Sequence, residues 1–196
     1  MPCLHPGDFR RLTSVNVSEL RKCIRNCIVF PQKGHRPHPN EMSGSDLDGD
    51  QYWVYWSNLL KIRQMDEPFS YDTAEKAVVP NVTRAIIVDH IIDSFDAASQ
   101  GIICSVHLAI ADSHPAHTSS NECKYLAELF ARAVDAPKSG EKIDLERVYE
   151  LRSEHIDGYG YPLFMKRTDK KIRDSNSIPN KLYIAARHHF FSKINL

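Results

Sequence analysis

Three aspartates stand at every second position in the run Asp46-Leu47-Asp48-Gly49-Asp50. In an extended or tightly looped backbone, side chains at positions i, i+2 and i+4 leave the chain on one face. Neighbouring carboxylates would then lie roughly 7 Å apart, close enough to share one divalent cation. Without a cation they would repel one another, and at least one would take up a proton. Because Mg²⁺ and Mn²⁺ prefer oxygen ligands, the run predicts a metal site formed by Asp46, Asp48 and Asp50.

Two other interpretations of this run are a calcium-binding EF-hand loop and a solvated acidic turn. An EF-hand loop that began at Asp46 would need glycine at its sixth position and glutamate at its twelfth. Those positions hold Gln51 and Ser57, which excludes the EF-hand. A solvated turn is the usual fate of a short Asp/Gly cluster, but the flanking residues argue against it.

The segment that follows the aspartates, Tyr52-Trp53-Val54-Tyr55-Trp56, contains both tryptophans of the chain. Aromatic and β-branched residues favour strands. We therefore expect a strand over residues 51–56 that packs beside a core. Such a strand would hold the aspartate loop rigidly, as a preorganised site requires.

The residues upstream extend the motif and carry a resemblance. The run Arg36-Pro37-His38-Pro39-Asn40-Glu41 leads through Met42-Ser43-Gly44-Ser45 into the aspartates, and Pro2-Cys3-Leu4-His5-Pro6-Gly7-Asp8 lies near the start. Together these residues resemble the catalytic region of the eukaryotic cellular RNA-dependent RNA polymerases of the RNA-silencing type. That family carries Pro-Cys-Leu-His-Pro-Gly-Asp, then Arg-Pro-His-x-x-Glu, then Ser-Gly-Ser-Asp-Leu-Asp-Gly-Asp.

The resemblance is dense over about residues 2 to 56 and continues more loosely beyond them. Residues 133–140 match a family pattern that ends in Lys-Thr-Gly, with Ser139 in place of the threonine, and Tyr161-Pro162-Leu163-Phe164-Met165 matches a second one. The aspartate loop is also similar to that of the largest subunit of multisubunit DNA-dependent RNA polymerases. There an Asn-Ala pair precedes the first aspartate, where this chain has Gly44-Ser45, so any sugar-selecting role of that asparagine is not carried over.

The resemblance implies Mg²⁺- or Mn²⁺-dependent nucleotidyl transfer from a nucleoside triphosphate to an RNA 3′-hydroxyl. The product would be double-stranded RNA for RNA silencing, and the partners would be RNA template and product, nucleoside triphosphates and an upstream barrel half of the polymerase. The resemblance assigns Asp46, Asp48 and Asp50 as the catalytic and metal-binding residues. Charge that develops on the leaving phosphates calls for cations. The residues expected to contact RNA or substrate are Arg36, His38, Lys33 and Lys138.

These basic residues have structural explanations too. Arg36 can make a bidentate contact to phosphate or ribose, and its place inside the motif favours that role, as it does for His38. For Lys138, RNA-backbone contact and a favourable position at a helix C-terminus are equally good explanations. For Arg21, Lys22 and Arg25 we expect a solvated face.

The composition limits the classes of protein to which this chain can belong. Lys and Arg number 25 and Asp and Glu also 25, a balance that is unusual for a nucleic-acid binder. The balance is uneven, because from Tyr161 onward eight Lys and Arg face only Asp169 and Asp174. This basic tail suits either an RNA backbone or ordinary helix ends. The five cysteines form no Cys-x-x-Cys pair, and no stretch reaches membrane-spanning length, so we expect an intracellular protein with reduced thiols, in cytoplasm or nucleus, without membrane contact.

The expected fold class is α+β. The resemblance implies a partial double-psi β-barrel over residues 1–65, which carries the metal loop on strands expected at 9–17, 26–30 and 51–56. A connector is expected at 66–81, and a mainly helical supporting segment at 82–196. Within it, periodicity predicts helices over 82–97 and 101–111 and another after Ser119 or Ser120. His90 and His107 are expected to be core or interhelical residues, and the pair His188-His189 to be exposed.

Relatives of the resembled family are several times longer, so we expect this chain to be a fragment of such a polymerase. Two alternatives to a catalytic portion stay open. The first is a non-catalytic RNA-binding or regulatory fragment. The second is an unrelated Mg²⁺-dependent phosphodiesterase, which is less favoured because no residue here can be assigned as its water-positioning base.

Overall fold

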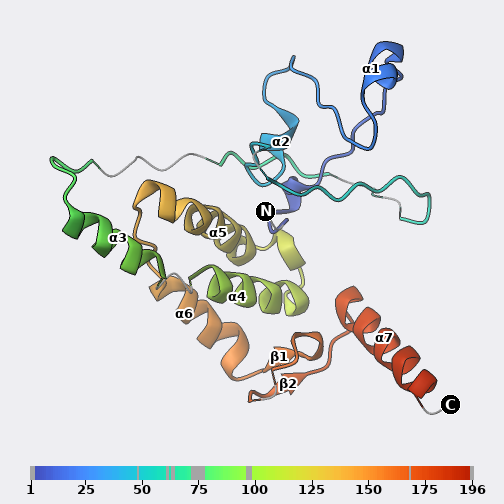
Figure 1. Ribbon diagram of the computed structural model, residues 1–196. Helices are drawn as coiled ribbons and strands as arrows, with labels where there is room; N and C mark the ends of the chain where they lie inside the picture. Colours follow the sequence, from blue (N-terminus) through green and yellow to red (C-terminus); the bar gives the residue numbers. More distant parts are fainter. Residues whose placement is uncertain are drawn as a thin grey trace. The chain divides into compact units, whose positions relative to one another are not determined.

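The computed structural model describes residues 3–47, 49–60, 62, 65–71, 78–95, 99–167 and 169–194, without the side chains of 93–95 and 191–194. The chain divides into two compact units, Met1–Asp72 and Thr73–Leu196 (Figure 1). The division falls inside the expected connector. The described residues form a mixed, helix-rich structure with one small two-stranded sheet, and both of its strands lie in the second unit.

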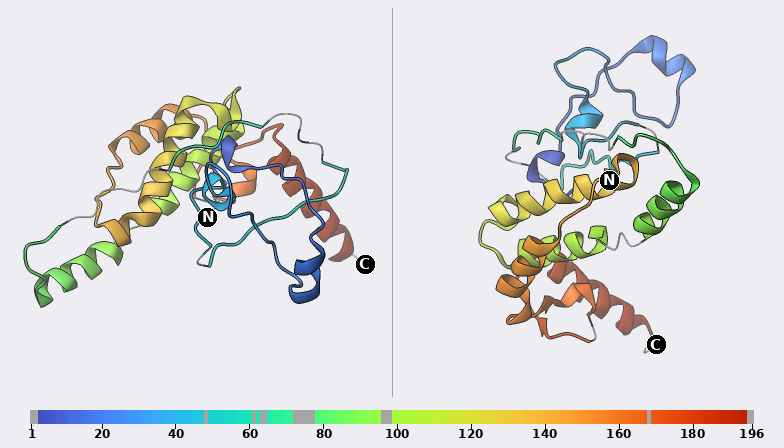
Figure 2. Two further views of the ribbon diagram at one scale, coloured as in Figure 1. Left: turned by 90° about the horizontal axis from the view of Figure 1, so that it is seen from above. Right: turned by 90° about the vertical axis from the view of Figure 1, so that its left-hand side faces the viewer.

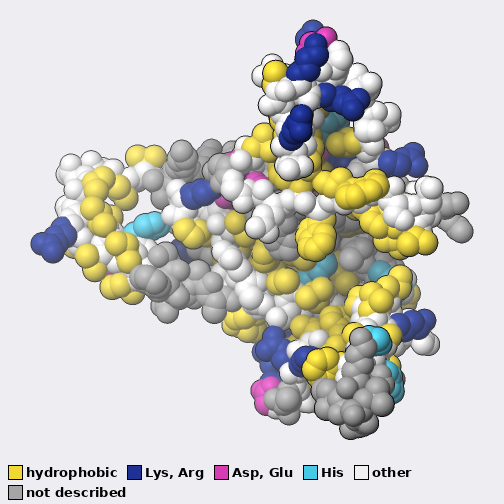
Figure 3. Space-filling model, turned by 45° about the vertical axis from the view of Figure 1, so that its right-hand side comes forward, with side chains coloured by type: hydrophobic (Ala, Val, Ile, Leu, Met, Phe, Trp, Pro, Cys, Tyr) yellow, Lys and Arg dark blue, Asp and Glu magenta, His cyan; other side chains and the backbone are white. Residues whose placement is uncertain are grey.

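The first unit combines loops with three short helices. These are the 3₁₀ turn η1 (Pro6–Asp8) and the helices α1 (Ser18–Cys23) and α2 (His38–Glu41). The basic side chains of α1, Arg21 and Lys22, are exposed. Together with the exposed Arg25 they form the solvated face that the sequence predicts. Figure 3 shows Lys and Arg side chains, in dark blue, gathered at the top of the face that it draws.

The three segments expected to be strands in this unit, 9–17, 26–30 and 51–56, are not strands in the described structure. Trp53 is 100% exposed and Trp56 is 86% exposed, so the prediction that the aromatic segment packs against a core is not met here. The physical reason is that β propensity expresses a fit to a half-buried pleated surface, which neighbouring strands must supply. The double-psi β-barrel is neither shown nor excluded by this structure, and it stays a prediction.

The second unit contains the helices predicted from periodicity. The elements are α3 (Arg84–Phe95), α4 (Ser99–Ser113), the 3₁₀ turn η2 (His117–Ser119), α5 (Asn121–Ser139), α6 (Glu146–Arg152), the π-helical turn η3 (Ser153–Asp157), β1 (Tyr161–Pro162), the 3₁₀ turn η4 (Leu163–Met165), β2 (Ile172–Arg173) and α7 (Ile178–Ile194).

The core of this unit lies between α4 and α5, which run side by side in both views of Figure 2. A 3.6-residue spacing of apolar side chains gives each helix one face to bury. The buried side chains include Ile103, Val106 and Ile110 from α4, Leu126, Leu129 and Phe130 from α5, and Val148 and Leu151 from α6. Burial of a side chain of this size contributes about 1.5–3 kcal/mol, so this cluster dominates the stability of the unit.

Local polar contacts fix the ends of α5 and join it to α3. The Ser120 hydroxyl accepts from the Cys123 amide at 3.1 Å, the N-cap that the sequence predicts, and Gly140 ends the helix with a φ of +76°. His90 Nε2 donates to the Pro137 carbonyl at 3.0 Å. His107 is buried on α4, and His188 and His189 are exposed. The four histidines therefore have the structural settings expected for them.

The small sheet follows α6 and is anchored to α4. Tyr161 and Ile172 are partners in a parallel pair, and the Tyr161 amide donates to the Lys171 carbonyl at 2.8 Å. A side chain at Gly160 would place its Cβ 2.7 Å from that same carbonyl oxygen, so only glycine permits this approach. After β2, Ser175 donates to Asp112 Oδ1 at 2.9 Å, which fixes the chain against α4 before α7 begins.

No helix in the described ranges is both long enough and apolar enough to cross a bilayer.

Candidate functional site

A tight turn joins α2 to the aspartate loop. Ser43 and Gly44 both have positive φ, +60° and +68°, and the Gly44 amide donates to the Asn40 carbonyl at 3.1 Å. A Cβ at Gly44 would lie 3.1 Å from the Cβ of Tyr71. The left-handed backbone favours glycine at this position, and any larger residue would also force the Tyr71 side chain to shift.

The Asp8 carboxylate holds this turn against the start of the chain. It is 2% exposed, and its Oδ2 accepts from the amides of Leu4 at 3.2 Å and His5 at 3.0 Å. Its Oδ1 accepts from the Ser43 amide at 3.1 Å and from the Tyr71 hydroxyl. Four donors thus satisfy one buried carboxylate, the condition under which a buried charge is tolerated.

Tyr71 and its neighbours close the other side of this arrangement. The Phe69 ring lies 5.1 Å from the rings of both His5 and Tyr71, measured between centroids. A Cβ at Gly7 would come within 2.1 Å of the Glu67 carbonyl oxygen, so residues 67–71 pass directly over η1. Burial raises the pKa of the Tyr71 hydroxyl, and its hydrogen bond to the Asp8 carboxylate raises the pKa further.

The aspartate loop is closed at its base by a serine–tyrosine pair. The Ser45 hydroxyl donates to the Pro39 carbonyl at 2.8 Å and lies 2.6 Å from the Tyr52 hydroxyl. A hydroxyl has one proton to give, so Tyr52 is the donor in the second bond. The Tyr52 ring packs 5.5 Å from that of Phe30, between centroids. The hydrogen bond between the two hydroxyls therefore holds the two ends of the loop, Ser45 and Tyr52, next to each other.

Within the loop, the backbone curls so that its two ends meet. The Asp46 amide donates to Asp50 Oδ2 at 3.1 Å, and Leu47 and Gly49 have φ values of +79° and +108°. A positive φ at a leucine is strained, and strain of this kind persists only where surrounding contacts enforce it. The Asp46 side chain is exposed and that of Asp50 is half-buried.

The structure brings Asp46 and Asp50 together, while Asp48 lies outside the described residues. Among the described residues, no group of three His, Cys, Asp or Glu side chains has the arrangement of a metal site. Because the third carboxylate of the predicted set is Asp48, the metal site stays a prediction.

The predicted phosphate-binding residues have different settings. Arg36 donates from Nε to Asn40 Oδ1 at 2.5 Å and from Nη2 to the Asn40 carbonyl at 2.8 Å, and so it braces α2. His38 Nδ1 lies 2.8 Å from Glu41 Oε2, within the same helix. Lys33 is exposed. Lys138 belongs to the second unit, where it pairs with Asp135 at 3.8 Å in the last turn of α5.

Sequence reasoning missed the residues that hold the loop. The sequence motif includes Asp8 without indicating what it contacts, and no pattern in the sequence predicts a role for Ser45, Tyr52 or Tyr71. A local signal did exist for Asp8, because its carboxylate accepts from the His5 amide while His5 Nδ1 accepts from the Gly7 amide, a reciprocal cap of the first helical turn. Its bonds to Ser43 and Tyr71 cross 35 and 63 positions and leave no local signal.

Comparison with known proteins shows similarity over nearly the whole chain. The family model described as RNA dependent RNA polymerase matches residues 1–186. A "Probable RNA-dependent RNA polymerase 2" of Oryza sativa subsp. japonica is 39% identical over 189 residues, which cover 96% of this chain and 16% of that protein. "RNA-dependent RNA polymerase 1" of Arabidopsis thaliana is 40% identical over 183 residues, 93% of this chain and 16% of its own length.

A yeast protein extends this similarity beyond plants. "RNA-dependent RNA polymerase 1" of Schizosaccharomyces pombe is 31% identical over 189 residues, which cover 93% of this chain and 15% of that protein. The chain thus spans about a sixth of the length of the curated relatives named here.

Asp8→Asn tests the contacts that hold the loop. The substitution replaces an acceptor oxygen by an amino group that faces N–H and O–H donors. We expect the amides of Leu4, His5 and Ser43 to lose their protection from hydrogen exchange, and the first unit to lose about 2–4 kcal/mol of stability. The measurement is residue-resolved amide exchange. Asp169→Asn, at a side chain 72% exposed, is the matched control and should change nothing; unchanged protection in Asp8→Asn would contradict the assignment.

Tyr71→Phe tests the bond between Tyr71 and Asp8 through its pH dependence. Because folding raises the pKa of Tyr71, the stabilisation is present below the unfolded value of about 10 and is lost as pH rises above it. We expect Tyr71→Phe to cost about 1–2 kcal/mol at pH 8 and progressively less towards about pH 11. The measurement is urea unfolding across this range. The exposed Tyr159→Phe serves as control; a cost of Tyr71→Phe that stays constant with pH would refute this account.

Proposed function

Since this chain belongs to the RNA-dependent RNA polymerase family, we propose that its first unit supplies the metal-binding part of a nucleotidyl-transfer centre. The observation that carries the proposal is the aspartate loop itself. It has the Ser-Gly-Ser-Asp-Leu-Asp-Gly-Asp sequence of the resembled polymerases, and in the structure its base is closed by Ser45 and Tyr52. The reaction transfers a nucleoside monophosphate to an RNA 3′-hydroxyl: the 3′-oxygen bonds to the α-phosphorus of the triphosphate, and pyrophosphate leaves. The double-stranded product serves RNA silencing.

The loop residues fit a hard divalent cation such as Mg²⁺ or Mn²⁺. Asp46, Asp48 and Asp50 would supply only carboxylate oxygens, and the Asp46 side chain is exposed. The bond from the Asp46 amide to Asp50 Oδ2 orients one carboxylate relative to the backbone of another. When bound, the cation would lower the pKa of the attacking hydroxyl and neutralise charge on the phosphates.

The residues around the loop supply position and charge. Asp8, Ser43 and Tyr71 fix the turn from which the loop leaves, so the start of the loop is positioned before the substrate binds. Lys33 is exposed and can contact a phosphate directly. Arg36 would have to exchange its bonds to Asn40 for bonds to a substrate, so we assign it first to holding α2.

The remaining parts of the centre would come from the polymerase outside these residues. Because the chain spans about a sixth of the relatives, RNA template and product, the nucleoside triphosphate and an upstream barrel half are proposed partners of the whole enzyme. Pairing with that half would also supply neighbours to the exposed segment 51–56, the condition that a strand needs there.

Mn²⁺ titration of the purified chain tests the metal loop. We expect saturable calorimetric binding in the wild-type chain and none in the triple variant Asp46→Asn, Asp48→Asn, Asp50→Asn. A variant with three aspartates of the second unit replaced, Asp135→Asn, Asp144→Asn and Asp169→Asn, is matched in charge and should bind as the wild type does. Binding that survives in the first variant, or its absence from a folded wild-type chain, would refute a metal site preformed in this chain.

Activity provides the second test. In a complete polymerase that contains this chain, Asp50→Ala should lower RNA synthesis by about a hundredfold or more, because it removes a carboxylate ligand of the cation that neutralises charge on the reacting phosphates. The readout is incorporation of labelled nucleotide on an RNA template, with circular dichroism to verify the fold. Asp144→Ala, at an exposed aspartate outside the loop and the pocket of the second unit, is the control. An Asp50→Ala enzyme of normal activity would exclude the proposed role.

A further inference from the structure

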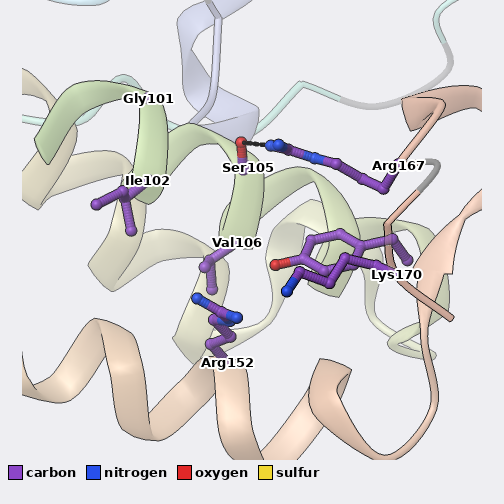
Figure 4. Close-up of a pocket in the computed structure, with 8 residues that line it drawn as sticks. Gly101, Ile102, Ser105, Val106, Arg152, Arg167 and Lys170 are labelled. Atoms are coloured by element: carbon purple, nitrogen blue, oxygen red, sulfur yellow. Dashed lines mark hydrogen bonds between the residues drawn. The ribbon is translucent and has the colours of Figure 1, made fainter. Parts of the chain in front are cut away.

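A pocket in the second unit gathers cations against α4. Its volume is about 350 Å³, and it is lined by Gly101, Ile102, Ser105, Val106, Arg152, Tyr161, Arg167 and Lys170 (Figure 4). Arg152 comes from the end of α6, whereas Arg167 and Lys170 come from the loop between η4 and β2. Among the described residues, those that line the pocket include three cations and no acidic side chain.

Within the part of the chain that the structure describes, the contacts of Arg167 leave its charge uncancelled. Its Nη2 donates to the Ser105 hydroxyl at 3.0 Å, which is the dashed line in Figure 4, and its guanidinium lies 5.5 Å from the centroid of the Tyr161 ring. Neither partner is charged. Both contacts hold the guanidinium in one place over the pocket, so a ligand would not have to order it.

The other two cations have carboxylate partners at the surface. Arg152 Nε lies 3.2 Å from Asp157 Oδ1, and Lys170 Nζ lies 3.7 Å from Asp169 Oδ2. The side chains of Asp157 and Asp169 are 51% and 72% exposed, so water screens these pairs and each is weak. An anion in the pocket can therefore compete for both cations.

The wall formed by α4 leaves room for a ligand. A Cβ at Gly101 would meet no atom within 4 Å, which places open space beside that helix turn. Tyr161 enters the lining from β1, whose backbone is fixed by the hydrogen bond from the Tyr161 amide to Lys171 and by the packing of Gly160. A volume of about 350 Å³ exceeds what one anion fills and lies within the range of small-molecule sites.

We propose that this pocket binds a phosphate group, with Arg152, Arg167 and Lys170 as its cationic contacts and the Ser105 hydroxyl as a neighbouring donor. A single carboxylate is matched by one guanidinium fork, whereas a tetrahedral phosphate presents oxygens to several donors that converge from different sides. The phosphate could belong to an RNA backbone or be a free anion. The site is separate in sequence from the aspartate loop and needs no metal, so it stands independently of the proposed function.

Binding by the full chain tests this proposal. The probes are a six-nucleotide single-stranded RNA and inorganic phosphate, each measured by calorimetry with EDTA present so that the aspartate loop contributes no metal. We expect Arg167→Gln and Lys170→Gln to weaken binding about tenfold or more. For RNA, each should lower the slope of log affinity against log salt by about 0.7. The controls Arg147→Gln and Lys181→Gln remove equal charge elsewhere in the unit and should change affinity little.

Gly101→Leu separates binding from structure. Arg167 also joins its loop to α4 by a hydrogen bond to Ser105, and the loss of this bond alone could disturb the fold. Gly101→Leu leaves every cation in place and fills the open space, so it should weaken binding while thermal unfolding stays close to that of the wild type. Lys170, whose side chain is 48% exposed, can be changed without loss of the fold.

The outcomes identify the source of the phosphate. Loss of affinity for both probes supports a general phosphate site, loss for RNA alone supports a backbone phosphate, and loss for inorganic phosphate alone supports a free anion. Affinities that match those of the controls would overturn the proposal. A hexaglutamate peptide that binds more tightly than RNA, and is lost in Arg167→Gln, would overturn it in favour of an acidic protein segment.

Discussion

The first unit depends on one buried carboxylate. Asp8 accepts from two amides beside it in sequence, from the amide of Ser43 and from the hydroxyl of Tyr71. A buried charge without such donors would cost several kcal/mol, so the four contacts together make the burial of this carboxylate tolerable. The turn that carries the aspartate loop is therefore positioned by residues at both ends of the unit. Glycines 7 and 44 are required because the chain passes so close there.

The helices of the second unit could be predicted from the sequence, whereas the contacts that hold the first unit together could not. Helices over 82–97 and 101–111 and the cap at Ser120 follow from local spacing, because a helix satisfies its own hydrogen bonds. Strands at 9–17, 26–30 and 51–56 need partners elsewhere, and no periodicity within the segment shows whether those partners are present. The role of Asp8 was missed for the same reason, since its contact with Tyr71 spans 63 positions.

The candidate site also has a part that can be predicted from the sequence and a part that cannot. The three aspartates can be predicted from their spacing and the flanking motif, because the type of a side chain determines which metal ions it can bind. The hydrogen bonds that hold the base of the loop cannot be predicted in this way, because they depend on the distances between particular hydroxyl groups and carbonyl oxygens in the folded chain. Ser45 must accept from Tyr52 once it has given its proton to Pro39, a conclusion that only the geometry permits. Arg36, expected at a phosphate, instead braces the helix that leads into the loop.

A formal net charge of zero is compatible with phosphate chemistry, because acidic residues cluster in one part of the chain and basic residues in another. The three aspartates gather within five positions, where they suit a cation that can in turn accept phosphate oxygens. Arg152, Arg167 and Lys170 gather around a pocket of the other unit, where they suit an anion directly. Salt screens exposed charges beyond a Debye length, about 8 Å at physiological salt, so a ligand responds to the charges around its own site more than to the net charge of the chain. A balanced composition therefore says little against nucleic-acid chemistry when charges of each sign are clustered.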